Sequence, residues 1–192
     1  MKVCLVVVLL LSPRVFAGAN LPLQSTLKTV EAPKKYCEFS SDELDVYSSQ
    51  LSRDSSPKRT MVVMATTLRW IDDINSFNLP LAFQGHAIPP DVRADFTEKN
   101  KTGCQIEPFD GVPNLRFMSS SEEEKLFARD WSEFSRKYGK GAERVAVSRV
   151  GFSVDKSLAL IHILYSASGE LYLLERKDGK WQVKFYVQTM AT

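Results

Sequence analysis

Residues 144–188 read RVAVSRVGFSVDKSLALIHILYSASGELYLLERKDGKWQVKFYVQ, and four apolar segments in them are separated by turn-forming residues. We expect strands over 144–152, 158–165, 171–176 and 181–187. Asp178-Gly179 predicts a two-residue hairpin turn, because both residue types tolerate positive φ. In the last segment apolar and polar residues alternate, which is typical of a strand with one buried and one solvent-facing side. The stretch therefore predicts a four-stranded antiparallel meander.

An amphipathic helix is predicted directly before the meander, over residues 121–138. Ser120 and Glu123 have the spacing of a capping box at its start. Spacings of four, three and four residues place four aromatic side chains on one face: Phe127, Trp131, Phe134 and Tyr138. We expect this face to pack across the meander. The predicted fold class is α+β, with a mainly antiparallel sheet packed against an aromatic helix.

The chain before this helix contains shorter predicted elements. Ser40 and Glu43 form another capping-box pattern, which predicts a helix over 41–52. Residues 61–67 are rich in β-branched side chains and predict a buried strand, which could extend the meander into a mixed sheet. The middle, 75–118, is expected to be rich in loops, with a short helix after Pro90 and a short strand near 114–118. It holds five of the nine prolines: Pro80, Pro89, Pro90, Pro108 and Pro113.

The N-terminus has the pattern of a cleaved secretory signal peptide. Lys2 precedes the apolar run from Val3 to Leu11, and small residues follow, so we predict cleavage after Ala17, with Ala19 as the alternative. Residues 18–38 then form an extended lead-in, and 39–192 form a single α+β domain. The interpretation predicts an exported protein, either periplasmic or extracellular.

Composition and charge exclude some functions. The 192 residues carry a formal charge of +2, and removing 1–17 lowers the basic residues from 25 to 23, equal to the 23 acidic ones. A mature chain of net charge zero is not a typical nucleic-acid-binding protein. Outside the signal peptide, no segment approaches the roughly 20 apolar residues that span a bilayer. We therefore expect a soluble monomer that does not insert into membranes, with an unidentified protein or small molecule as its partner.

Cleavage would also leave two cysteines, Cys37 and Cys104. A disulfide is the natural interpretation in an exported chain. The alternatives are a free buried thiol and a catalytic nucleophile, although neither local sequence matches a protease signature.

Several stretches of the second half resemble a group of uncharacterised exported bacterial proteins. They are DFTEKN (95–100), WSEFSRKYG (131–139), VSRVGF (147–152) and DGKWQV (178–183). The resemblance covers about 95–185 and departs at 166–169, where the group often has a turn rich in Cys and Gly. It implies export and an α+β fold, and it implies no activity and no functional residue.

Two histidines and one arginine are the candidate functional residues. His86 lies in a loop before two prolines, where no partner is visible in the sequence; this favours an exposed loop histidine, and the alternative is a general base. His162 shares the phase of Leu160 and Leu164, which favours a packed, hydrogen-bonded strand histidine. Arg149 lies among apolar strand residues and needs a partner. The pattern favours a structural ion pair with an acid of the helix or a neighbouring strand, and the alternative is an anchor for an anionic ligand.

The sequence offers no metal or cofactor motif. It lacks a nucleophile elbow, a glycine-rich phosphate loop and a dinucleotide fingerprint. Asp72-Asp73 and Glu122-Glu123-Glu124 are adjacent residues that would diverge on a helix rather than converge on one ion. We therefore expect a non-catalytic binding or interaction module without cofactor or metal, acting through the Pro-rich middle or through the open face of 182–188. The alternative is a small hydrolase or lyase with His86 as general base.

Overall fold

A sheet with helices on both faces forms the centre of the structure, a computed structural model that describes residues 35–54, 59–68, 82–83, 86–127, 131–166 and 168–191. The predicted signal peptide, most of the lead-in and Asp72-Asp73 lie outside these residues. The helices are α1 (Ser41–Asp54), α2 (Pro90–Lys99), α3 (Ser120–Phe127) and α4 (Trp131–Tyr138). The strands are β1 (Met61–Val63), β2 (Ala82–Phe83), β3 (His86–Ala87), β4 (Leu115–Phe117), β5 (Glu143–Val147), β6 (Gly151–Phe152), β7 (Leu158–Leu164), β8 (Ser168–Lys177) and β9 (Lys180–Ala191).

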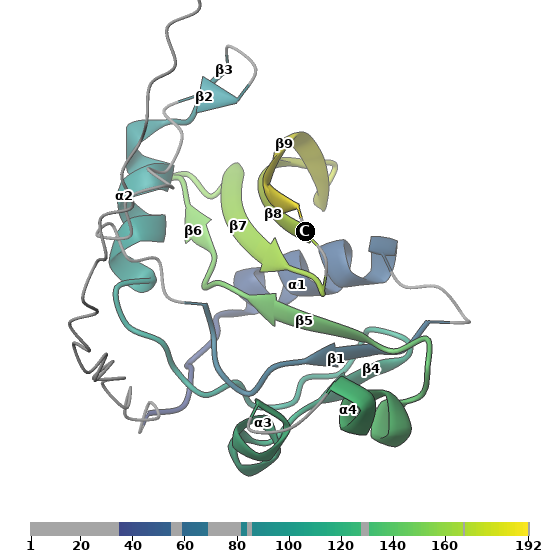
Figure 1. Ribbon diagram of the computed structural model, residues 1–192. Coiled ribbons are helices and arrows are strands. Elements are labelled where there is room, and N and C mark those ends of the chain that lie inside the picture. Colours follow the sequence, from purple (N-terminus) through teal and green to yellow (C-terminus); the bar gives the residue numbers. More distant parts are fainter. Residues whose placement is uncertain are drawn as a thin grey trace, which may run out of the picture. The chain divides into compact units, whose positions relative to one another are not determined.

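The seven-stranded sheet is mixed, so the prediction of a mainly antiparallel sheet was wrong. Its order is β4-β1-β5-β7-β8-β9, with β6 also paired to β7 (Figure 1). β1 pairs in parallel with both β4 and β5, and the pairs β5–β7, β7–β8 and β8–β9 are antiparallel. β4 and β5 lie on either side of β1 and run in the same direction as it. Parallel strands need a crossover connection, and the chain from β4 to β5, which includes α3 and α4, provides one. β2 and β3 form a separate two-stranded hairpin.

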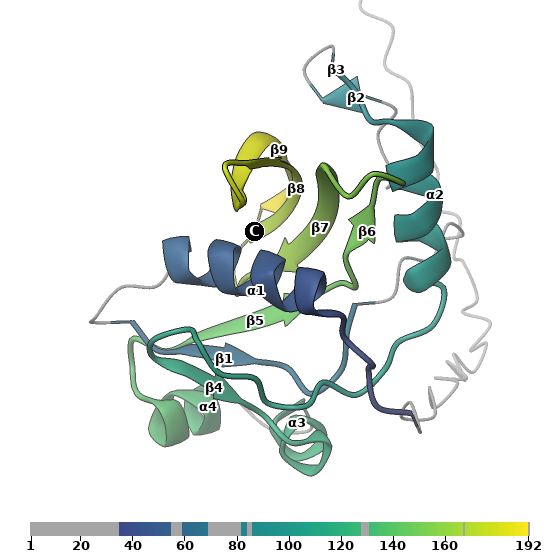
Figure 2. The ribbon, with the colours of Figure 1, turned by 180° about the vertical axis from the view of Figure 1, so that it is seen from behind.

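One face of the sheet packs against α1 (Figure 2). Val46, Tyr47 and Leu51 of α1 are fully buried against alternate residues of β5, β7 and β8. Those strand residues are Val145, Val147, Ile161, Ile163, Tyr172 and Leu174.

The opposite face packs against the other helices. Val92 and Phe96 of α2 are buried against Leu160, Leu171 and Leu173 of β7 and β8. Because both faces are covered, β7 is apolar at every position except His162 rather than alternating.

The aromatic helix was predicted to pack across the meander, and this was wrong. Phe134 of α4 is buried against Val62 of β1 and Met118, which places α4 over the parallel half of the sheet. Of the predicted helix over 121–138, the described residues form α3 and α4, and 128–130 lie outside them. The capping box is one residue earlier than predicted: Ser119 Oγ accepts from the Glu122 N–H and the Glu122 carboxylate accepts from the Ser119 N–H.

Two other strands differ from prediction. β1 has three residues instead of the expected 61–67, and the strand predicted over 144–152 is divided into β5 and β6. Between these two strands the N–H of Arg149 donates to the side chain of Asn100 at 2.7 Å, rather than to a neighbouring strand.

The local turn and capping predictions at two other places are confirmed. The Ser40 N–H donates to the Glu43 carboxylate at 3.1 Å, and the Glu43 N–H donates to Ser40 Oγ at 3.2 Å, so α1 begins with the predicted capping box. Asp178 and Gly179 have φ of 50° and 74° in the β8–β9 hairpin. The alternation of β9 is also present, with Gln182, Lys184, Tyr186 and Gln188 exposed.

Candidate functional site

Arg149 forms the predicted ion pair, although its acidic partner lies on α1 rather than on the aromatic helix or a neighbouring strand. Its Nε donates to Glu43 Oε1 at 2.8 Å and its Nη2 donates to Glu43 Oε2 at 2.9 Å. The Glu43 side chain is 2 % exposed and that of Arg149 is 17 % exposed. The Glu43 carboxylate raises the pKa of Arg149 further, so the guanidinium stays charged. This two-bond contact joins α1 to the segment between β5 and β6.

The side chain of Asn100 makes hydrogen bonds to the backbone of Arg149, next to this ion pair. Its side-chain amide donates to the carbonyl oxygens of Phe96 and Arg149, and its oxygen accepts from the Arg149 N–H. Asn100 is fully buried. The chain Asn100-Lys101-Thr102 has the form of a glycosylation sequon, and this burial excludes glycan attachment in the folded protein.

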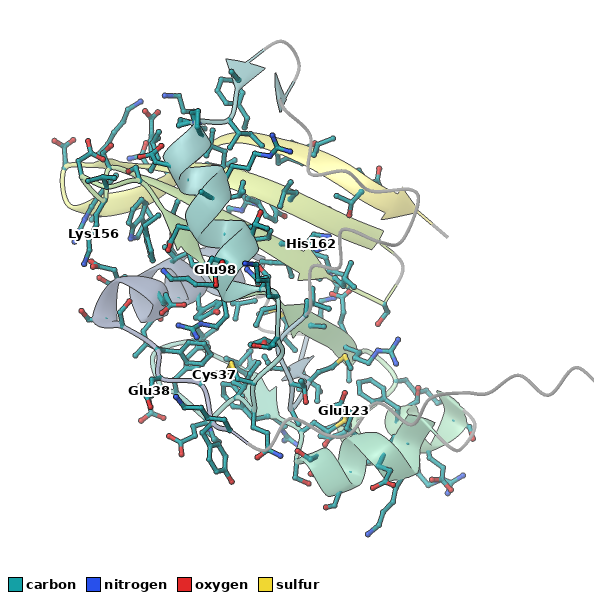
Figure 3. All side chains as sticks on the ribbon, turned by 90° about the vertical axis from the view of Figure 1, so that its left-hand side faces the viewer. Cys37, Glu38, Glu98, Glu123, Lys156 and His162 are labelled. Carbon is teal, nitrogen blue, oxygen red and sulfur yellow. A yellow bond between two sulfur atoms is a disulfide. The ribbon has the colours of Figure 1, made fainter. Side chains whose placement is uncertain are left out.

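The two histidines lie in different settings. The backbone of His86 pairs with Phe83 in the β2–β3 hairpin, and its side chain lies outside the described residues. His162 of β7 is 9 % exposed, and its Nε2 lies 2.9 Å from Thr189 Oγ1, which confirms a packed, hydrogen-bonded strand histidine (Figure 3). Burial lowers the pKa of His162 to about 4. The imidazole is therefore neutral at pH 7.

Cys37 and Cys104 form the predicted disulfide, with their Cα atoms 5.2 Å apart. The bond lies within a small extension of strand pairing. The Cys37 N–H donates to the Gln105 carbonyl at 2.8 Å, and the Gln105 N–H donates to the Lys35 carbonyl at 2.9 Å. On the other side of this segment, the Thr67 N–H donates to the Cys104 carbonyl at 2.9 Å. The disulfide and these bonds fix residues 35–37 and 104–106 against the chain that follows β1.

A half-open cavity of about 260 Å³ lies beside this braced segment, and we call it the aromatic pocket. It is found just after the carboxyl ends of the parallel strands β1 and β4, where α3 begins. Crevices outside the carboxyl ends of parallel strands are the usual place for ligands in open α/β sheets. The residues that define its chemistry are Tyr36, Gln105, Ile106, Phe117, Ser120 and Glu122.

The aromatic pocket combines apolar walls with a few polar groups. Tyr36 is 56 % exposed although it is a large aromatic residue. It directly precedes the disulfide-bonded Cys37. Ile106 is buried and Phe117 is half-buried, so the walls are largely apolar. Gln105 Nε2 donates to Ser120 Oγ at 3.0 Å, which orients both side chains at the edge of the cavity.

Acidic side chains of α3 hold the helix against this pocket. Glu122 accepts from the Ser119 N–H, and Glu123 Oε2 accepts from the Ala65 N–H at 2.9 Å (Figure 3). Glu123 is half-buried, and desolvation raises the pKa of its carboxyl. The Ser119–Glu122 capping box uses the N–H groups of Ser119 and Glu122, and the Glu122 carboxylate lies in the lining, so the pocket does not favour an anion.

The described residues contain no group of three or more His, Cys, Asp or Glu side chains that could hold a metal ion. Glu122 and Glu123 diverge as expected for neighbours on a helix, one to the helix start and the other to the chain after β1. Within this same part of the chain, no helix is long and apolar enough to cross a membrane.

The sequence interpretation did not identify the individual residues of the aromatic pocket. It named the Pro-rich middle as a possible surface, and Gln105, Ile106 and Phe117 belong to that region. The available signal was the disulfide, since a crosslink between 37 and 104 necessarily brings Tyr36 close to Gln105. Neither a family model, nor a curated protein, nor a solved structure gave a significant match to the chain.

Proposed function

We propose that the protein is an exported binding protein that takes a small, largely apolar ligand into the aromatic pocket. The observation that carries the proposal is the pocket itself, a preformed cavity of about 260 Å³ between an exposed tyrosine and the carboxyl ends of two parallel strands. Ligand sites are typically concave and mostly apolar, with a few polar groups that orient the ligand.

The ligand chemistry follows from the pocket lining. Tyr36 and Phe117 provide aromatic surface, which favours a planar or aromatic ligand. Gln105 offers an amide oxygen at the edge, which favours a ligand with an N–H or O–H donor, whereas the Glu122 carboxylate is already engaged by Ser119, Tyr138 and Lys137. A small aromatic molecule with one donor therefore fits both parts of the lining.

Export is the second part of the proposal. The Cys37–Cys104 disulfide supports it, because such bonds persist in oxidising compartments. The signal-peptide pattern of 1–17 and the resemblance to exported bacterial proteins point the same way, to the periplasm or the cell exterior. The alternative of a hydrolase or lyase with His86 as general base stays a prediction from the sequence, because the side chain of His86 lies outside the described residues.

Binding can be tested with indole, an aromatic probe with one N–H donor, followed through the amide NMR resonances of the full mature chain. We expect saturable shifts around Gln105, Phe117 and Ser119. Replacing Tyr36 by Ala should weaken binding about fivefold or more, since aromatic contacts contribute about 1 kcal/mol beyond the area they bury.

Tyr186→Ala is the matched control, because Tyr186 of β9 is 55 % exposed and Tyr36 is 56 % exposed. This variant should bind indole as the unchanged protein does. If indole instead shifted resonances along β9, and only Tyr186→Ala weakened it, binding would belong to the open face of 182–188 and the proposal would be wrong. No saturable shift with the folded protein would also overturn it.

A further inference from the structure

A second cavity of about 260 Å³ lies at the start of β5, and we call it the charged cleft. It is lined by Arg59, Glu143, Tyr165, Ser168 and Glu170. These residues come from the chain before β1 (Arg59), the start of β5 (Glu143), the turn after β7 (Tyr165) and the start of β8 (Ser168 and Glu170). The cleft shares no residue with the aromatic pocket and is independent of it.

The strand register places both glutamates on the α1 face of the sheet. Glu143 lies two residues before Val145, and Glu170 lies two residues before Tyr172. Val145 and Tyr172 both belong to the core under α1. Successive side chains of a strand alternate between faces, so each glutamate shares the face of its buried neighbour. The apolar core under α1 therefore ends in two carboxylates at this edge of the sheet.

Each carboxylate is held by a different partner. Glu143 is 8 % exposed and pairs with Arg59 at 2.6 Å. Glu170 accepts a hydrogen bond from the hydroxyl of Tyr172, whose side chain is buried. A carboxylate has room for about four hydrogen bonds. The Tyr172 hydroxyl fills only part of that capacity at Glu170.

The lining has a net negative charge. One guanidinium faces two carboxylates, which leaves a formal charge of −1 in a partly enclosed space. An ion pair in such a cleft is screened less than one on an open surface. The hydroxyl groups of Tyr165 and Ser168 add neutral hydrogen-bonding partners beside the charges.

We propose that the charged cleft binds a small organic cation through a primary ammonium group. An ammonium carries three donors and a positive charge, which matches the acceptor capacity of Glu170 and the net charge of the lining. Glu143 and Arg59 form the wall against which the cation lies, and Ser168 and Tyr165 accept its remaining donors or bind its polar tail.

The test uses 1,4-diaminobutane as probe and 1,4-butanediol as its uncharged counterpart of similar size, each titrated into the full mature chain. We expect the diamine to give saturable shifts of the amide resonances of 168–170 and Arg144, and the diol to give none. Equal shifts with diol and diamine, or no saturable shift with the diamine, would overturn the proposal.

One variant of the lining and one control outside it locate the binding. Glu170→Gln should weaken diamine binding about tenfold or more, because it removes the charge and keeps the shape. Glu98→Gln is the control, since Glu98 lies on the exposed side of α2 and pairs with Lys101 (Figure 3). Diamine affinity that is the same in Glu170→Gln and the unchanged protein would contradict the proposal.

Arg59→Gln should strengthen diamine binding, whereas Glu170→Gln should weaken it. This prediction can be tested even if Glu170→Gln does not fold. The side chain of Arg59 is 49 % exposed, and the amide of Gln can still donate to the buried Glu143 carboxylate; urea unfolding should first show that the variant is folded. It removes the cation that competes with the ligand for Glu143, and diamine binding should become several-fold tighter. Weaker binding in this folded variant would show that the cleft does not select a cation.

Discussion

Gly151 of β6 lies directly against the backbone of Phe96 in α2. A Cβ added at Gly151 would be 2.5 Å from the Cα and the Cβ of Phe96, well inside van der Waals contact. Both partners are fixed, because Phe96 is fully buried and β6 pairs with β7. The close approach of helix and strand therefore depends on the missing side chain.

Gly151→Ala should destabilise the protein by about 1–3 kcal/mol or more, because helix or strand must move to make room. The free energy of unfolding in urea measures the effect. Gly139→Ala is a useful comparison, since Gly139 has a φ of 100° but no atom within 4 Å of an added Cβ. There the change should be about 1 kcal/mol, from backbone strain alone. Equal values for the two variants would contradict the crowding at Phe96.

Arg149→Met should destabilise the protein by about 3–5 kcal/mol, because it leaves the buried Glu43 carboxylate without its cation. Adding Glu43→Gln should recover part of this loss, since the amide carries no charge and can still cap α1. Lys101→Met breaks an exposed pair with Glu98 and should change stability by less than about 1 kcal/mol. Urea unfolding of the four proteins tests the ordering, and a double variant less stable than Arg149→Met would refute it.

Reduction of the Cys37–Cys104 disulfide should lower stability by about 4 kcal/mol, mainly by freeing the unfolded chain across a sequence separation of 67. The same bond holds Tyr36 beside Gln105, so the Cys37→Ser/Cys104→Ser variant should also lose indole binding in the aromatic pocket. Thermal unfolding and the indole titration measure the two effects. Unchanged indole binding in the folded double variant would show that the pairing of 35–37 with 105 does not need the crosslink.

Features encoded by neighbouring residues were predictable from the sequence. The Ser40–Glu43 capping box and the Asp178-Gly179 turn each depend on residues within three positions of each other, so spacing and residue type define them. The disulfide was predictable because only two cysteines followed the signal peptide. Arg149 was expected to have an acidic partner on physical grounds, but nothing in the sequence pointed to Glu43, 106 residues away.

The parallel strands of the sheet were not predictable, because their pairing depends on residues far apart in the sequence. β1 and β4 have three residues each, which is too short for a periodic pattern, and their pairing is set by contacts far apart in the chain. The aromatic pocket depends on this pairing, because it joins Tyr36, Gln105 and Phe117 from three separate segments. Such a site becomes visible only when strand order and register are known.

The burial of His162 should make stability fall as the pH falls from about 6.5 to 4. Its pKa is lowered to about 4 in the folded protein, from an ordinary value of 6.5, so the unfolded chain binds the proton first. Stability is full above pH 6.5, and about 3 kcal/mol is lost by pH 4. His162→Gln cannot bind this proton and should have a flatter profile in urea unfolding between pH 7 and pH 4. Other titrating groups such as Glu123 are present in both proteins and cancel in the difference, so parallel profiles would show that His162 is not the source of the acid sensitivity.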